Sequence, residues 1–131
     1  MYIFCVLQEG TDIEPLSIKA ARYNAKMNNV ESKFKVWNCS NHSSDDTHSK
    51  DQRQHDIIVA NILKGPLIEL APVLAAYRKP TSVLGLSGIV SSQVEDVIQA
   101  YSDYFQNFNV HSAVGSEWGL ITAQSKLDSD T

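Results

Sequence analysis

The sequence predicts an α/β fold with a mostly parallel sheet. Short apolar runs alternate along the chain with segments of helical periodicity, which is the pattern of parallel strands joined by helices. The runs at residues 56–60 and 83–87 are almost continuously apolar, as strands buried on both faces are. The chain has 131 residues, of which 43% are hydrophobic and 20% are charged, and these are the proportions of one globular domain.

The first part of the chain predicts a strand, a helix and a second strand. Residues 1–8 are apolar enough for a buried strand, and the following residues read as the strand end turning into a helix. Pro15 suits the first helical position, and the helix runs to about Met27. Residues 34–37 alternate weakly and predict a strand. Three residues share the apolar face of the helix: Ile18, Ala21 and Ala25.

A polar stretch at residues 38–55 predicts a mobile loop, because it has little apolar area to offset the entropy of ordering. The histidines and aspartates in it raise the alternative of a metal site: His42, Asp45, Asp46, His48 and His55. Their spacings match neither a helical nor a zinc-finger pattern. We therefore expect a solvated loop and no metal.

The next part predicts a strand, a helix and another strand. The strand at residues 56–60 ends at Asn61, and the helix opens at Pro66. Pro72 lies inside the helical pattern, so we expect a kink there or a later helix start. The strand at residues 83–87 follows. The apolar helix face consists of Leu67, Leu70, Ala71, Leu74 and Tyr77.

A helix and a terminal hairpin complete the predicted order of elements. Ser92 and Glu95 have the spacing of a capping box. The helix after them is predicted to bury Val94, Val97, Ile98, Tyr101 and Phe105. Residues 107–111 alternate, and residues 118–123 return beside them as a second strand. We expect Trp118 in the core rather than on a substrate-binding surface.

Charge and cysteine content exclude several classes of protein. The net charge is −4, and residues 66–131 carry 3 basic and 7 acidic side chains, which argues against a nucleic-acid partner. Cys5 and Cys39 are expected to be free thiols in a reducing compartment. No apolar run approaches the roughly 20 residues of a membrane span, and no signal peptide is evident. We expect a soluble intracellular protein without membrane partners, in the cytoplasm, a chloroplast or a mitochondrion.

Two polar residues are candidates for ligand binding. Ligands of parallel α/β sheets bind at the carboxyl ends of the strands, and Asp12 and Asn61 fall at such ends. The pattern leaves alternatives for each. Asp12 also suits a residue that caps the following helix or turns the chain, and Asn61 one that bonds backbone at a strand end.

Several segments resemble one family of proteins. Residues 12–25 and 56–63 resemble the S-adenosylmethionine-dependent class I methyltransferases, and they are most similar to the PrmA family, which trimethylates a protein of the large ribosomal subunit. The similarity continues through residues 65–89 and the final hairpin with Trp118. Val-Ala-Asn-Ile-Leu at residues 59–63, followed by Gly-Pro-Leu and Leu-Ser-Gly-Ile, is its most specific part.

The resemblance implies a fold, a cofactor and roles for three residues. The fold would be a partial Rossmann-like class I methyltransferase sheet, mostly parallel with a C-terminal antiparallel hairpin and lacking its first strand. S-adenosylmethionine would be the cofactor. Asp12 would bind the ribose hydroxyls, since a carboxylate accepts from both, and Ile13 would pack on the adenine. Asn61 would be catalytic, contacting the cofactor and orienting the incoming amine.

One part of the family pattern has no counterpart. The family's glycine-rich turn precedes the residue corresponding to Asp12, and no Gly-x-Gly occurs in residues 1–11. We therefore expect residues 1–131 to form a truncated methyltransferase domain that binds the cofactor incompletely. Its expected irregular parts are an atypical start at 1–9, the polar loop, and a frayed tail at 124–131.

The resemblance implies a protein-lysine N-methyltransferase whose candidate substrate is a ribosomal protein. A first alternative is a related lysine methyltransferase that acts on the electron-transfer flavoprotein beta subunit. A second is a non-catalytic interaction protein that pairs with another chain through the gap left by the first strand. A third, a nicotinamide-dependent Rossmann enzyme, needs a G-x-G-x-x-G turn that the sequence lacks.

Overall fold

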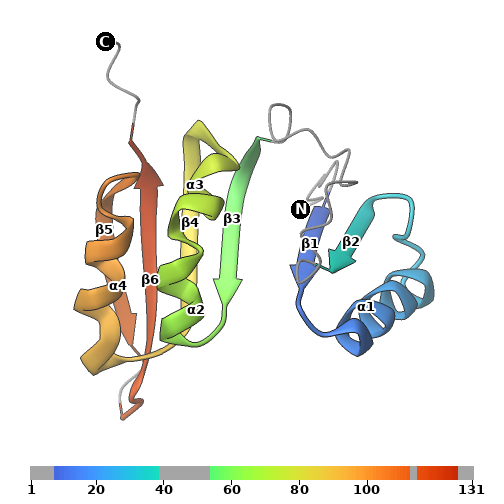
Figure 1. The fold of residues 1–131 in the computed structure, drawn as a ribbon, viewed down its shortest axis with the longest axis horizontal. Coiled ribbons are helices and arrows are strands. Elements are labelled where there is room, and N and C mark those ends of the chain that lie inside the picture. The colour runs from blue at the N-terminus through green and yellow to red at the C-terminus, as the bar shows by residue number, and fades with distance from the viewer. Residues whose placement is uncertain (1–7, 39–53, 113–114, 127–131) are drawn as a thin grey trace. The chain divides into compact units, whose positions relative to one another are not determined.

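The structure, a computed structural model, describes residues 8–38, 54–112 and 115–126 (Figure 1). The chain divides into two compact units, Met1–His48 and Ser49–Thr131. In the described part of the chain no helix is long and apolar enough to cross a membrane.

The first unit is a strand–helix–strand unit with parallel strands. It contains β1 (Gln8–Asp12), α1 (Pro15–Met27) and β2 (Phe34–Asn38). The strands pair in register from Gln8 opposite Phe34 to Asp12 opposite Asn38. This confirms the predicted strand end, helix and second strand. Of the strand expected at residues 1–8, only Gln8 lies within the described residues.

Helix α1 packs on the small sheet through the apolar face that the sequence predicts. Ile18 and Ala25 are buried, and the guanidinium of Arg22 donates to the Val36 carbonyl at 3.0 Å, which ties the helix to β2. Pro15 is the first helical residue, as expected. The N-cap is Glu14, whose carboxylate accepts from the Leu16 amide at 3.2 Å.

The second unit is a four-stranded sheet with helices. The strand order is β3-β4-β6-β5, in which β3 and β4 are parallel and both pairings of β6 are antiparallel. This confirms an α/β fold whose sheet has parallel strands and a C-terminal antiparallel hairpin, although in this sheet the antiparallel pairings outnumber the parallel one. The elements are β3 (His55–Asn61), α2 (Lys64–Glu69), α3 (Ala71–Ala76), β4 (Arg78–Val90), the 3₁₀ turn η1 (Ser91–Gln93), α4 (Val94–Tyr101), β5 (Phe105–Ser112) and β6 (Trp118–Ser125).

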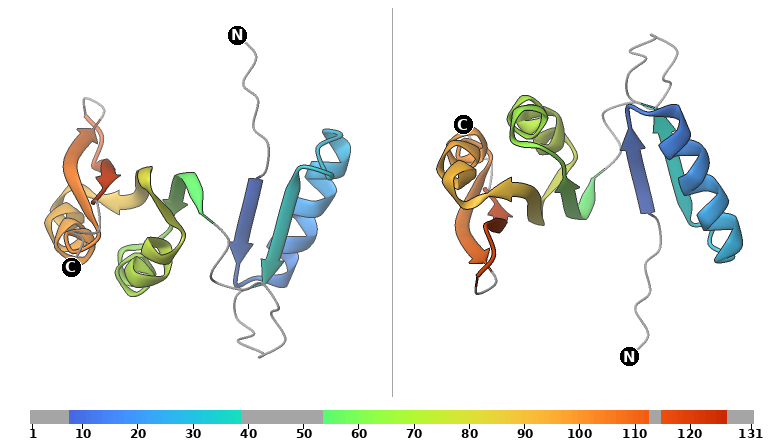
Figure 2. Two further views of the ribbon diagram at one scale, coloured as in Figure 1. Left: turned by 90° about the horizontal axis from the view of Figure 1, so that it is seen from above. Right: turned by 90° about the horizontal axis from the view of Figure 1, so that it is seen from below.

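The helices of the second unit lie on one face of its sheet, and the core is between them (Figure 2). The buried hydroxyl of Tyr101 in α4 donates to the carbonyl of Leu67 in α2 at 2.8 Å. The opposite face is exposed: Ile57 and Val59 of β3 are 69% and 72% accessible. The fully buried apolar side chains of the core are Leu67, Leu84, Leu86, Ile89, Val97, Tyr101, Phe105 and Ile121.

Several sequence predictions are refined by the structure. Pro72 interrupts the helical pattern as expected, because α2 ends at Glu69 and α3 begins at Ala71 with the proline in its first turn. The predicted capping box of Ser92 and Glu95 is replaced by an earlier start, since the Val90 amide donates to Gln93 Oε1 at 3.2 Å before η1.

Some boundaries were predicted wrongly. Phe105 belongs to β5 rather than to the helix, because α4 ends at Tyr101 and the Phe105 ring enters the core from the sheet. The tail does not begin at Gln124, since β6 continues to Ser125, which pairs with Phe105 and is buried. The polar stretch predicted at residues 38–55 is too long at both ends, since Asn38 ends β2 and His55 begins β3. The other residues weighed for a metal lie outside the described residues.

Candidate functional site

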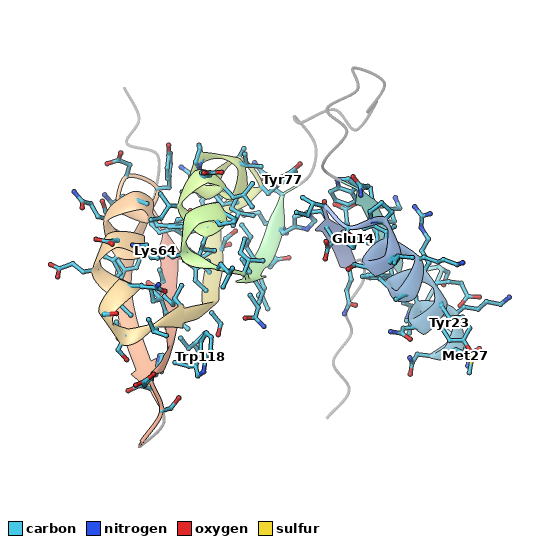
Figure 3. All side chains as sticks on the ribbon, turned by 60° about the horizontal axis from the view of Figure 1, so that its bottom comes forward. Glu14, Tyr23, Met27, Lys64, Tyr77 and Trp118 are labelled. Carbon is cyan, nitrogen blue, oxygen red and sulfur yellow. The ribbon has the colours of Figure 1, made fainter. Side chains whose placement is uncertain are left out.

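Asp12 is the last residue of β1 and holds the turn into α1. Its side chain is exposed, and Oδ1 accepts from the Glu14 amide at 2.8 Å. Asp12 therefore turns the chain, which is one of the alternatives that the sequence left open. The residue that caps α1 is Glu14, which Figure 3 labels. The turn uses one carboxylate oxygen, and among the described residues Oδ2 accepts no hydrogen bond.

The segment after Asp12 is held from β2. Asn38, opposite Asp12 in the register, donates from Nδ2 to the Ile13 carbonyl at 2.8 Å. Thr11 Oγ1 donates to the Trp37 carbonyl at 3.2 Å. The side chain of Ile13 is 70% accessible, so the fixed backbone presents an apolar side chain to solvent beside a carboxylate. Sequence reasoning missed Asn38, although its place at the end of a parallel strand was a signal.

Asn61 is the last residue of β3 and is exposed. It lies opposite Ser87 of β4 in the register. Within residues 8–38, 54–112 and 115–126, the side-chain amide makes no hydrogen bond, so it does not fulfil the alternative of bonding backbone at a strand end. An asparagine amide offers an acceptor and two donors, all of which are available to a ligand.

The backbone that follows Asn61 packs so closely against β4 that a side chain would not fit between them. Gly88 of β4 has φ of +83°, and a Cβ at that position would lie 2.6 Å from the carbonyl oxygen of Ile62. Only glycine permits this contact. It fixes the chain directly after Asn61 against the bulge in β4 that separates Leu86 from Ile89 in the pairing with β6.

Trp118, expected in the core, is 59% accessible, and that prediction is wrong. It is the first residue of β6 and lies opposite Val90, close to the end of β4. Strand alternation explains its exposure. Gly119 faces α4, where a Cβ would come within 3.2 Å of Val94, so Trp118 points to the uncovered face. In the sequence, the glycine that follows Trp118 indicates which of the two neighbouring residues packs against the helix.

The predicted site residues are thus found at strand ends in both units. Asp12 and Ile13 lie in the first unit, and Asn61 lies in the second with Ser87, Gly88 and Trp118. Among the described side chains no group of three or more histidine, cysteine or acidic residues is placed to hold a metal ion.

The fold defines the class of protein. A SAM-dependent O-methyltransferase from Thermotoga maritima matches 94% of this chain and 51% of its own, with a TM-score of 0.71 at 10% identity. A crystal structure of the ribosomal protein L11 methylase from Lactobacillus delbrueckii subsp. bulgaricus gives 0.73 at 28% identity, covering 91% of this chain and 57% of that one. The fold is therefore that of the class I methyltransferases.

The family follows from the sequence matches. The family profile described as ribosomal protein L11 methyltransferase (PrmA) matches residues 7–126, and the chain belongs to that family. The ribosomal protein L11 methyltransferase of Photorhabdus laumondii is 46% identical over 96 residues, which are 73% of this chain and 30% of the relative. That of Chromohalobacter salexigens is 42% identical over 117 residues, 88% of this chain and 36% of the relative. The chain spans about a third of their length.

Proposed function

We propose that this chain carries part of the catalytic domain of a SAM-dependent protein-lysine N-methyltransferase whose substrate is a ribosomal protein of the L11 type. Membership of the PrmA family supports the reaction class. The observation that carries the proposal is the exposed amide of Asn61, which makes no hydrogen bond to any residue that the structure describes and lies on a strand end that Gly88 holds in place.

Asp12 and Ile13 fit the nucleoside part of the cofactor. Oδ2 of Asp12, which accepts no hydrogen bond from a described residue, can accept one from a ribose hydroxyl, and charge-assisted hydrogen bonds of this kind are among the stronger ones. Ile13 offers exposed apolar area on which an adenine ring can pack. The bond from Asn38 keeps the Ile13 backbone in place, so little ordering is needed on binding.

Asn61 fits the incoming amine. Its amide oxygen can accept a hydrogen bond from a neutral lysine amine and thereby direct the nitrogen lone pair. Bound S-adenosylmethionine supplies an electrophilic methyl group on a positively charged sulfur. The lysine nitrogen must be neutral to attack. The contribution of Asn61 is thus to orient the amine rather than to transfer a proton.

Isothermal titration of the 131-residue chain with S-adenosylmethionine tests the cofactor part of the proposal. Because residues 1–11 of the titrated chain contain no Gly-x-Gly, we expect this chain to have a dissociation constant on the order of 1 mM. Asp12→Asn should weaken binding at least tenfold, and Asp103→Asn, at another exposed acid, should leave it unchanged. Micromolar binding would overturn the view of an incomplete site, and equal binding of NAD would favour a nicotinamide enzyme.

A second candidate function rests on β3. Among the described residues β3 pairs only with β4, and it exposes Ile57 and Val59. Such an edge can accept a strand from another chain, as a non-catalytic interaction protein would use it. Size-exclusion chromatography of the expressed chain distinguishes an interaction protein from a chain that merely aggregates. A soluble complex of defined stoichiometry supports the interaction protein, and aggregation of the chain argues against it.

A further inference from the structure

Trp118 lies on the same face of the sheet as Asn61. In β6 the residues toward the helices are Gly119 and Ile121, so Trp118 points the other way. In β3 the residue toward the helices is Ile58, which is buried, so Asn61 also points away from them. Single exposed apolar residues are common and need no explanation. Trp118 differs because it lies on the same face of the sheet as the Asn61 amide.

Trp118 also lies at the same end of the sheet as Asn61. Strand β3 ends where β6 begins, at the lower edge of the sheet in Figure 1. Asn61 is opposite Ser87, and Trp118 is opposite Val90 on the other side of the same strand. Across the sheet, two strand spacings separate β3 from β6, together roughly 10 Å, and along β4 the register places Trp118 three residues beyond Asn61, at most about another 10 Å. The indole, labelled in Figure 3, and the side chain of a bound lysine both extend from their backbones, and together they can span this diagonal.

The start of β6 is held firmly. The Glu117 carbonyl accepts from the Ser91 amide at 2.8 Å and from the Ser91 hydroxyl at 3.1 Å. The Trp118 amide donates to Ser116 Oγ at 3.1 Å. An aromatic ring on a fixed backbone loses little entropy when a ligand binds, so its exposure here is suited to recognition.

The chemistry of the ring and its surroundings favours a lysine side chain. An indole face attracts a cation and covers an aliphatic stem, which are the two parts of lysine. Glu117 next to it is exposed, and residues 66–131 carry 3 basic and 7 acidic side chains. Both features attract a basic peptide and not an acidic one.

We infer that Trp118 is a positioning residue for the substrate: its ring holds the stem of a lysine of the protein substrate so that the amine reaches Asn61. The inference rests on the proposed function for the identity of the substrate. The proposed contact is with the substrate and not with the cofactor. Binding of a lysine peptide and binding of the cofactor can therefore be tested separately.

The test is a titration of the ¹⁵N-labelled chain with the peptide acetyl-Ala-Lys-Ala-amide, followed by NMR. The chain has two tryptophans, and Trp37, in the other unit, is an internal control. We expect the Trp118 indole signal to shift saturably and the Trp37 signal to stay in place. The same peptide with norleucine in place of lysine should bind several-fold more weakly, because it lacks the nitrogen.

Two variants complete the test. Trp118→Ala should weaken peptide binding about tenfold, read from the amide of Asn61, and Trp118→Phe should retain part of it. A well-dispersed spectrum of each variant shows that it has folded. Equal shifts of both indoles, no shift of Trp118, or a response of Trp118 to S-adenosylhomocysteine alone would overturn the inference. If the peptide shifts the Trp118 signal saturably but the chain does not bind the cofactor, the inference about Trp118 is supported. The part of the proposed function that concerns the cofactor is then rejected.

Discussion

At the scale of single residues, Gly88 decides whether the end of β3 keeps its shape. A methyl group there would lie 2.6 Å from the Ile62 carbonyl oxygen at a φ of +83°. We expect Gly88→Ala to lower the free energy of unfolding by roughly 2–4 kcal/mol, through strain and displaced backbone. Chemical denaturation measures this.

Gly85 is the matched control for Gly88, because it lies in the same strand with room for a methyl group. A Cβ added at Gly85 would have a Val59 methyl as its nearest neighbour, at 3.9 Å, which is an ordinary contact. Gly85→Ala should therefore change stability by less than about 1 kcal/mol. Similar losses in the two variants would show that the contact with Ile62 has no special importance.

Tyr101 is a second residue with a measurable effect. Burial raises the pKa of its phenol, so the hydroxyl stays protonated and donates to the Leu67 carbonyl. Tyr101→Phe leaves that buried acceptor unsatisfied and should cost about 1–2 kcal/mol of stability. In Tyr104→Phe no hydrogen bond among the described residues is lost, and stability should be nearly unchanged. An equal loss in both variants would contradict the assignment.

At the scale of elements, an ion pair links β3 and β4. Lys79 Nζ lies 2.8 Å from both carboxylate oxygens of Asp56. The hydrogen bond from Lys79 holds the pKa of Asp56 below its ordinary value. The pair's small contribution is therefore present above that ordinary value and is lost as the pH falls through the lowered pKa.

The variant Lys79→Met should raise the pKa of Asp56 toward its ordinary value, as followed by the carboxyl ¹³C shift. Lys64→Met removes a different ion pair, to Asp96 at 2.9 Å, and should leave the pKa of Asp56 in place. An unchanged pKa of Asp56 in Lys79→Met would mean that the ion pair does not persist in solution.

The elements themselves were largely predictable, and the errors have local causes. Periodicity located α1 and the strands β3 and β4, because each has a run of apolar residues with a clear period. The end of α4 was misjudged because Phe105 continues the helical spacing of its buried face, although the chain turns at 102–104. Spacing cannot distinguish an apolar residue in a helix from one that enters the same core from a strand.

The candidate site was predictable only in part. The ends of strands indicated Asp12 and Asn61, but the unbonded state of the Asn61 amide depends on neighbours that a sequence does not reveal. The exposure of Trp118 depends on which face of β6 the helices cover, and this follows from Gly119 and Val94 packing together. An aromatic residue in an apolar context is most often buried, so composition favoured the wrong prediction.

At the scale of the whole molecule, the second unit holds the apolar core. All residues of the buried cluster, from Ile58 to Ala123, lie within Ser49–Thr131. We expect this segment, produced alone, to fold and to give amide signals that overlay those of the full chain. Collapse of the spectrum to random-coil positions would show that the second unit needs the first for its stability.

The central claim is that the exposed side-chain amide of Asn61 belongs to a methyltransferase site. Titration of the ¹⁵N-labelled chain with S-adenosylhomocysteine tests it most directly, with the side-chain amide signals of Asn61 and of Asn109, an exposed asparagine in β5, followed together. We expect the Asn61 signal to shift saturably and the Asn109 signal to stay in place. No shift of the Asn61 signal, or equal shifts of the two, would contradict the claim.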